Sequence, residues 1–112
     1  MKFSLIICTY QRPKPLLQLL QSVQEQTLYP DEILIIDGST NEATQFILEQ
    51  NHFQNVHYFL VPKEHRGLTK QRNFGIEKVS SDVEIVCFLD DDTVLSTDYF
   101  AQLVTTFQSD ET

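Results

Sequence analysis

The sequence predicts an open, doubly wound α/β sheet of Rossmann-like βαβαβαβα order, because apolar runs and helical patterns alternate along it. The runs are rich in Ile, Val and Phe. Most of them are nearly continuous, which is typical of strands buried on both faces of a parallel sheet. They lie at residues 3–8, 32–36, 56–61 and 83–89. A chain of 112 residues suits one compact domain over 1–112.

The segments between the runs have the residue spacing of amphipathic helices. Pro13 and Pro15 fit the first turn of the first helix. The candidate caps of the second and fourth helices are Asn41 or Thr40, and Ser96 or Thr97. The expected stripes are Leu16, Leu19, Leu20, Val23 and Thr27; Phe46 and Ile47; Leu68, Arg72, Gly75, Ile76 and Val79; and Phe100, Leu103, Val104 and Phe107.

The charge of the chain excludes some classes of partner. A formal net charge of -8 argues against non-specific binding of nucleic acid, which needs a basic face. The few cations are clustered, however, since five of the eight Lys and Arg lie between positions 63 and 78 and Arg12 and Lys14 follow the first run. This clustering indicates either a local anion site or a solvated helix face.

The two cysteines, Cys8 and Cys87, lie inside apolar runs and have no zinc-site spacing. Buried reduced thiols favour a reducing compartment, so we expect a cytoplasmic protein, with the full-length form at the inner face of a membrane as an open alternative. The apolar start of the chain is too short for a signal peptide or a membrane span.

The candidate site lies where strand order would reverse. In a sheet of order 3-2-1-4, ligands bind beyond the carboxyl ends of the first and fourth strands. The residues at those ends are Thr9 and Tyr10, and the acidic triplet, which we define as Asp90, Asp91 and Asp92. Asp37, at the end of the second strand, would be their neighbour.

Three adjacent carboxylates repel one another unless a cation or protons compensate them. A hard divalent cation, Mn²⁺ or Mg²⁺, would do so, and such ions are often held by one or two carboxylates together with substrate phosphates. The basic cluster would then face a phosphorylated ligand. The simpler interpretation of the triplet is a solvated turn whose side chains cap the following helix.

Other α/β enzymes fit less well. The spacing Asp90-x-Asp92 also opens haloacid-dehalogenase-type phosphatases, but only 20 residues follow Asp92. A response-regulator receiver needs acidic residues at the end of its first strand, where this chain has Thr9 and Tyr10. A sugar-1-phosphate nucleotidyltransferase would need a glycine-rich loop after the first strand, where CTYQRPKP has no glycine.

Four segments, in order, resemble the N-terminal half of family 2 glycosyltransferases of the GT-A fold. They are FSLIICTYQRPKPLLQLLQSVQEQT, EILIIDGST, RGLTKQRNFGI and CFLDDDTVL. The last of them resembles the DxD segment of the family. The resemblance covers nearly the whole chain and implies a nucleotide-diphospho-sugar-binding domain with a partial GT-A fold, part of a longer catalytic domain.

The resemblance also implies roles for individual residues. Thr9 and Tyr10 would line the nucleotide pocket, and Asp37 would accept a hydrogen bond from the base. Arg72, with Arg66 as a second cation, would reach the nucleotide or its phosphates. Asp90 and Asp91 would contact the ribose or the water shell of the metal. Asp92, with Asp90, would bind Mn²⁺ or Mg²⁺. The implied donor is a UDP-sugar, and the implied acceptor is a saccharide or a lipid-linked sugar.

Some positions depart from the family pattern. Ile36 stands where a second Asp is common, and Gln71 stands where Ala is usual. The general base of the family lies downstream of the DxD segment. Asp110 and Glu111 are poor candidates for it, so the resemblance implies a base beyond Thr112 and no catalytic residue within the chain.

We therefore expect the isolated chain to bind nucleotide weakly and to transfer little sugar. A non-catalytic nucleotide- or metal-binding module is the alternative. An exposed sheet edge would also favour self-association.

Overall fold

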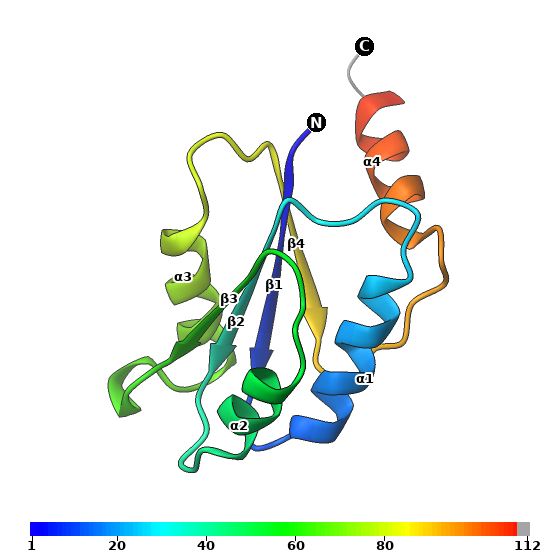
Figure 1. Cartoon of the computed structure of the whole chain (residues 1–112). Helices are drawn as coiled ribbons and strands as arrows, with labels where there is room; N and C mark the ends of the chain where they lie inside the picture. Colours follow the sequence, from blue (N-terminus) through cyan, green and yellow to red (C-terminus); the bar gives the residue numbers. More distant parts are fainter. Residues whose placement is uncertain (110–112) are drawn as a thin grey trace.

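The computed structural model describes residues 1–109. Asp110, Glu111 and Thr112 lie outside the described residues, so the expectation that the general base follows Thr112 stays a prediction. Strands and helices alternate as the sequence predicts, with one short 3-10 helix before the third α-helix (Figure 1). The elements are β1 (Phe3–Thr9), α1 (Pro13–Gln24), β2 (Glu32–Asp37), α2 (Ala43–Gln50), β3 (Val56–Leu60), η1 (Lys63–His65), α3 (Leu68–Lys78), β4 (Ile85–Asp90) and α4 (Tyr99–Ser109).

The four strands form one parallel sheet in the order β3-β2-β1-β4, which confirms the predicted order. The direction in which successive strands are added to the sheet reverses between β1 and β4. The carboxyl ends of these two parallel strands are therefore neighbours. In the register, Cys8 stands beside Asp90, and Thr9 stands beside Asp37. The topology thus brings three of the predicted site segments to one edge of the sheet.

Helices α1, α2 and α4 cover one face of the sheet (Figure 1). This face holds the larger core, in which leucines of α1 pack on alternate residues of the central strands. The ring of Phe3 contacts that of Phe100 with centroids 5.2 Å apart, which ties α4 to β1. The residues buried on this face include Leu5, Ile7, Leu16, Leu19, Leu20, Val23, Ile33, Ile35 and Val104.

Helix α3 alone covers the opposite face, and it approaches the sheet closely at Gly75 (Figure 1). A Cβ at this glycine would lie 2.9 Å from Cγ2 of Ile6, closer than real side chains pack. Of the expected stripe, Gly75 is buried as predicted, but the prediction was wrong for Leu68 and Ile76, because α3 turns Gln71 inward beside Gly75 instead. Leu68 and Ile76 are about half exposed.

This single-helix cover leaves the β4 edge of the sheet open on one face. Val86 and Phe88 of β4 are 38% and 37% exposed, so the prediction of burial on both faces was wrong for the fourth run. Strand β3, at the other edge, is also only partly buried. Phe46 and Phe107 are likewise exposed. The end of α4, the helix that carries Phe107, extends past the sheet (Figure 1).

Side-chain hydrogen bonds, one local and one from a residue distant in sequence, help to begin α2 and α4. Asn41 Oδ1 accepts a hydrogen bond of 3.1 Å from Ala43 N at the start of α2, whereas the hydroxyl of Thr40 donates to Gln11. At the start of α4, the side chain that accepts a hydrogen bond from the first turn belongs to neither expected cap, Ser96 or Thr97. Phe100 N donates instead to Oε1 of Gln26, 3.1 Å away. No helix among residues 1–109 is long and apolar enough to cross a membrane.

Candidate functional site

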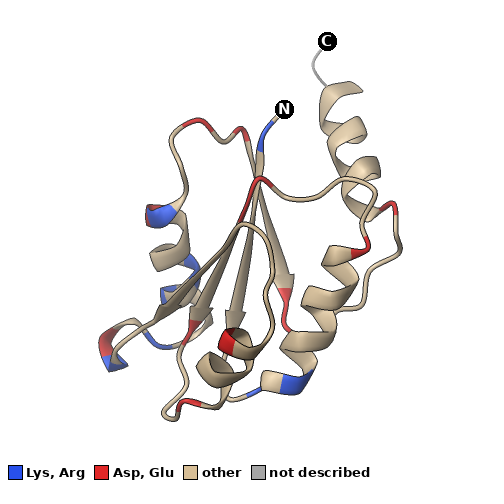
Figure 2. Ribbon diagram, in the orientation of Figure 1, with Lys and Arg blue, Asp and Glu red and all other residues tan. Residues whose placement is uncertain are grey.

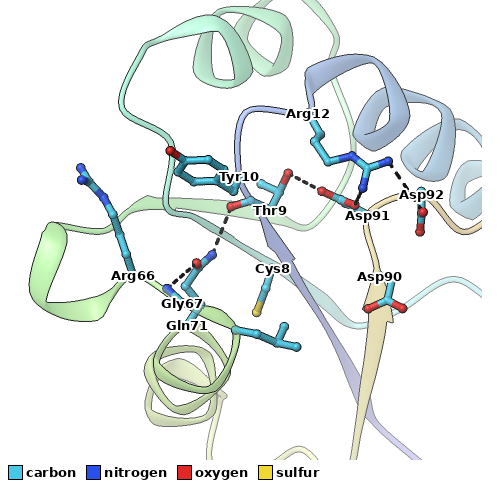
Figure 3. A pocket seen from close by; sticks show the side chains of 11 residues that line it. Cys8, Thr9, Tyr10, Arg12, Arg66, Gly67, Gln71, Asp90, Asp91 and Asp92 are labelled. Carbon is cyan, nitrogen blue, oxygen red and sulfur yellow. Dashed lines mark hydrogen bonds and ion pairs between the residues drawn. The ribbon is translucent and has the colours of Figure 1, made fainter.

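A cavity of about 650 Å³ opens at the carboxyl ends of β1 and β4, where the sequence places the site (Figure 3). One wall is the acidic triplet, the floor is the end of β1, and the other wall is the turn that leads into α3. The lining residues are Cys8, Thr9, Tyr10, Arg12, Arg66, Gly67, Leu68, Gln71, Asp90, Asp91 and Asp92. Six of the eight predicted binding or metal residues therefore line a single cavity.

The acidic wall is held by residues of the β1–α1 segment. Thr9 Oγ1 donates a hydrogen bond to Asp91 Oδ2, 2.9 Å away. The guanidinium of Arg12 lies 3.6 Å from Asp91 Oδ1 and 3.7 Å from Asp92 Oδ2. Asp90 lies apart from Arg12 (Figure 3). Asp91 and Asp92 thus contact the β1–α1 segment, rather than capping the next helix as the simpler interpretation required.

The three carboxylates differ in exposure. Asp91 is buried, whereas Asp90 and Asp92 are exposed to the cavity or solvent. Burial raises the pKa of Asp91, the Thr9 hydrogen bond and the Arg12 charge oppose this rise, and the charges of Asp92 and Asp90 add to it. The electrostatic environment of Asp91 therefore favours additional positive charge beside the triplet.

The opposite wall is organised by Gln71. Its Nε2 donates to the carbonyl oxygens of Thr9 (3.1 Å) and Ile36 (2.9 Å), and its Oε1 accepts from Gly67 N (3.1 Å). Arg66 extends from the same turn beside Tyr10, across the cavity from the triplet (Figure 3). Arg66 Nε is buried and has no hydrogen-bond partner among the described residues. This N–H is available to a ligand or a water molecule.

Asp37 does not line the cavity. It is fully buried, and Oδ1 accepts hydrogen bonds from the backbone N (2.9 Å) and hydroxyl (2.5 Å) of Ser39. Oδ2 accepts one from Tyr58 Oη, 2.5 Å away. Burial raises the pKa of Tyr58, and the bond to Asp37 and the charge of Asp37 raise it further. Because Asp37 is fully buried, Tyr58 or Ser39 would have to move before a base could reach it.

Arg72 also lies outside the cavity lining. Its guanidinium carbon stands 5.5 Å from the centroid of the Phe88 ring, on the open face of β4. Figure 2 shows the basic residues of α3 and η1 on one side of the sheet edge and the acidic end of β4 on the other. Of the predicted site residues, Arg72 and Asp37 are therefore the two that do not line the cavity.

Five residues of the cavity lining were not predicted as site residues, namely Gly67, Leu68, Arg12, Gln71 and Cys8. Arg12 could have been found, because it follows the first strand directly, where the site was expected. Gln71 had been noted only as a departure from the family pattern. Cys8 lines the floor, but burial, above all, raises its pKa to about 11. It is therefore a neutral thiol at pH 7, and its expected structural role holds.

The carboxylates of the cavity could bind a metal ion only if a bound ligand or water supplied its remaining coordination sites. No group of three or more His, Cys, Asp or Glu within residues 1–109 is arranged to hold a metal ion. A cation here would have one or two carboxylate ligands and would need others from a ligand or water, an arrangement common for Mg²⁺. The hard oxygen donors of Asp90 and Asp92 fit Mg²⁺ or Mn²⁺ in that role.

Comparison with known families settles the class of the chain. The sequence model of "Glycosyl transferase family 2" matches residues 4–112. The chain belongs to glycosyl transferase family 2. This match agrees with the resemblance of the four segments, and the four-stranded sheet in the order β3-β2-β1-β4 has the fold that the resemblance implied.

Named family 2 relatives are similar over most of the chain. It is 34% identical over 94 residues to the UDP-Gal:alpha-D-GlcNAc-diphosphoundecaprenol beta-1,3-galactosyltransferase of Escherichia coli, covering 80% of this chain and 34% of the relative. It is 30% identical over 96 residues to the GalNAc(5)-diNAcBac-PP-undecaprenol beta-1,3-glucosyltransferase of Campylobacter jejuni, covering 84% and 30%. The chain therefore spans about a third of the length of these relatives.

A solved structure, that of S. aureus TarS, shares the fold. Residues 1-349 of S. aureus TarS, crystallised in complex with UDP-GlcNAc, superpose with a TM-score of 0.81 at 25% identity. The match covers 97% of this chain and 32% of the TarS chain. The same part of TarS has also been crystallised in complex with UDP.

Proposed function

We propose that this chain is the donor-binding half of an inverting, metal-dependent glycosyltransferase that uses a UDP-sugar. The observation that carries the proposal is the single cavity in which Thr9, Tyr10 and Arg66 face the acidic triplet. Membership of family 2 and the likeness to a TarS structure that contains UDP-GlcNAc support this choice of donor.

In this proposal each wall binds a different part of the donor. Thr9 and Tyr10 contact the nucleoside at the end of β1, and Arg66 offers its unpaired Nε–H to a polar group of the ligand. Asp90 and Asp92 hold Mn²⁺ or Mg²⁺ against the diphosphate. When bound, the cation would stabilise negative charge on the departing diphosphate as a Lewis acid.

Asp37 and Arg72 take part only after rearrangement. Asp37 accepts an N–H of the base once Tyr58 or Ser39 releases one carboxylate oxygen. Arg72 reaches the nucleotide after leaving the ring of Phe88. Each move exchanges an existing contact for one to the ligand, so we assign these two residues smaller contributions to affinity than Arg66 and the triplet.

Sugar transfer needs groups besides those of the cavity. The acceptor hydroxyl, of a saccharide or a lipid-linked sugar, attacks the anomeric carbon from the face opposite the leaving diphosphate, and a carboxylate base takes its proton. Among residues 1–109, the carboxylates that line the cavity are those of the triplet, which this proposal assigns to the donor. We therefore place the general base beyond Thr112 and expect no appreciable transfer by this chain alone.

The free thiols Cys8 and Cys87 support a reducing compartment, and hence a cytoplasmic site of action for the proposed enzyme. The alternative function, a non-catalytic module that binds nucleotide and metal, uses the same cavity. It would differ from the donor-binding half only if a longer form of the protein also failed to transfer sugar.

Calorimetric titration of UDP, with and without Mn²⁺, tests the proposal. We expect Mn²⁺-dependent binding that Asp92→Asn abolishes. Asp98→Asn is the matched control, because Asp98 is an exposed aspartate outside the cavity. Absence of UDP binding by the unmodified protein with Mn²⁺, or retention of it in Asp92→Asn, would refute the proposed donor site.

A further inference from the structure

We infer that Gln71 is a positioning residue that holds the turn carrying Arg66 in place at the cavity wall and so sets the affinity for the nucleotide. The inference rests on the proposed function. Gln71 is only 4% exposed, and its carboxamide makes three hydrogen bonds. They join the ends of two strands to the turn before α3, which no other described side chain does.

The turn needs such support because of its backbone. Gly67 has a φ of 110°, a conformation that only glycine adopts readily. Gln71 holds this residue from both sides, since its Oε1 accepts from Gly67 N (3.1 Å) and its own backbone N donates to Gly67 O (2.8 Å). A flexible glycine is thereby fixed by a side chain anchored to the sheet.

The same carboxamide sets the position of Arg66. A Cβ built on Gly38 would lie 2.8 Å from Gln71 Oε1 and 3.4 Å from Cγ of Arg66. Gln71 and the stem of Arg66 are thus packed side by side against the Gly38 backbone. The buried Nε of Arg66, which has no partner among the described residues, is held at the cavity by this packing.

Loss of the carboxamide should therefore act through Arg66. In Gln71→Met the chain length is kept and all three bonds are lost. Arg66 would then sample more positions, and binding would have to order the turn again. We expect UDP affinity, with Mn²⁺ present, to fall about tenfold, within the usual range for contacting residues of one network.

A double-mutant cycle separates positioning from general destabilisation. Arg66→Gln and Arg12→Gln each remove one guanidinium from the cavity, but only Arg66 lies on the turn that Gln71 holds. We expect Gln71→Met with Arg66→Gln to bind UDP no worse than the weaker single variant. Gln71→Met with Arg12→Gln should instead show the product of the two single effects.

Each result of the cycle is decisive. Unchanged UDP affinity in Gln71→Met, or effects that multiply with Arg66→Gln as they do with Arg12→Gln, would overturn the inference while leaving the donor site intact. If the unmodified protein binds no UDP, the proposed function fails first and the role of Gln71 in affinity fails with it. Should Gln71→Met unfold, Gln71→Ala, which leaves room for water, replaces it in the same cycle.

Discussion

Thr9, at the end of β1, donates a hydrogen bond of 2.9 Å to the buried carboxylate of Asp91, which follows β4. The two residues are 82 positions apart in the sequence, and this bond joins the two strands on either side of the reversal of strand order. It also holds the middle of the acidic triplet at a fixed distance from the floor of the cavity. The predicted nucleotide residue and the predicted acidic site are thus one hydrogen-bonded unit.

Thr9→Val should destabilise the fold by about 1–3 kcal/mol near neutral pH, because it leaves a buried carboxylate without its donor. The effect depends on pH. The pKa of Asp91 is raised on folding, so the favourable contribution of its protonated form is present below about 3.8 and is lost as pH rises through the folded value. The Thr9 hydrogen bond acts in the opposite direction, since it stabilises the ionised carboxylate of Asp91. This carboxylate is protonated in acid, so the cost of Thr9→Val should shrink there.

Urea unfolding of Thr9→Val over a range of pH measures this cost. Thr9→Ser is the control, since it keeps the hydroxyl and should remain close to the unmodified protein. Thr9→Val keeps the methyl group and loses only the hydroxyl, so a stability of Thr9→Val equal to that of the unmodified protein would show that the hydrogen bond to Asp91 carries no stability.

Glu32 has the opposite pH dependence. Burial by itself would raise its pKa, but hydrogen bonds from Ser4 and from the N and Oγ of Ser80 (2.9 and 2.7 Å) outweigh burial and lower it. A lowered pKa stabilises the fold above 4.5, and this stability is lost as pH falls through the folded value. Glu32→Gln should cost about 1–3 kcal/mol at pH 7 and much less in acid.

Thermal unfolding at a series of pH values from 7 down into acid measures the cost of Glu32→Gln. Glu25→Gln, at an exposed position after α1, is the control and should leave the curve unchanged. If Glu32→Gln lowers the melting temperature equally at every pH, the hydrogen bonds to Ser4 and Ser80 do not depend on the charge of Glu32.

Arg12 would compete with a divalent cation that binds the triplet, because it already lies beside two of the three carboxylates. Its distances of 3.6 and 3.7 Å to Asp91 and Asp92 are those of loose ion pairs, each worth roughly 0.2–1 kcal/mol. Removing the guanidinium in Arg12→Gln breaks both pairs, so it should tighten the binding of Mn²⁺ alone by about two- to thirtyfold. Lys14→Gln, which removes a nearby cation that does not line the cavity, should change little.

Electron paramagnetic resonance of free Mn²⁺, titrated with protein in the absence of nucleotide, measures this affinity directly. Weaker Mn²⁺ binding in Arg12→Gln would mean that Arg12 orders the carboxylates for the metal rather than competing with it.

The open face of β4 should promote self-association, as the sequence suggested for an exposed edge. Val86 and Phe88 are both more than a third exposed there, and Leu68 and Ile76 of α3 lie about half exposed. Light scattering should show a molar mass that rises with concentration, and Phe88→Ser should reduce this rise. Phe46→Ser, on the opposite side of the sheet, is the control. A constant monomer mass at all concentrations would contradict the prediction.

The sequence alone determined the element order, the strand order and the place of the site. Continuous apolar runs mark strands by short-range patterning, and the ends of parallel strands necessarily meet at one edge. Thr9, Tyr10 and the triplet could be placed together on that argument without any knowledge of side-chain contacts.

Only the tertiary structure decided which of the predicted side chains can contact a ligand in the cavity. Asp37 is occupied by Ser39 and Tyr58, Arg72 lies on Phe88, and Gln71 supports the wall that carries Arg66. The contacts of Arg72 and Gln71 depend on the rotation of α3 about its axis, which Gly75 sets by its close approach to Ile6. Helical periodicity placed Gly75 inward correctly but also placed Leu68 and Ile76 there, because it weighs hydrophobicity, whereas the polar Gln71 takes the inward position through its bonds to Thr9 and Ile36.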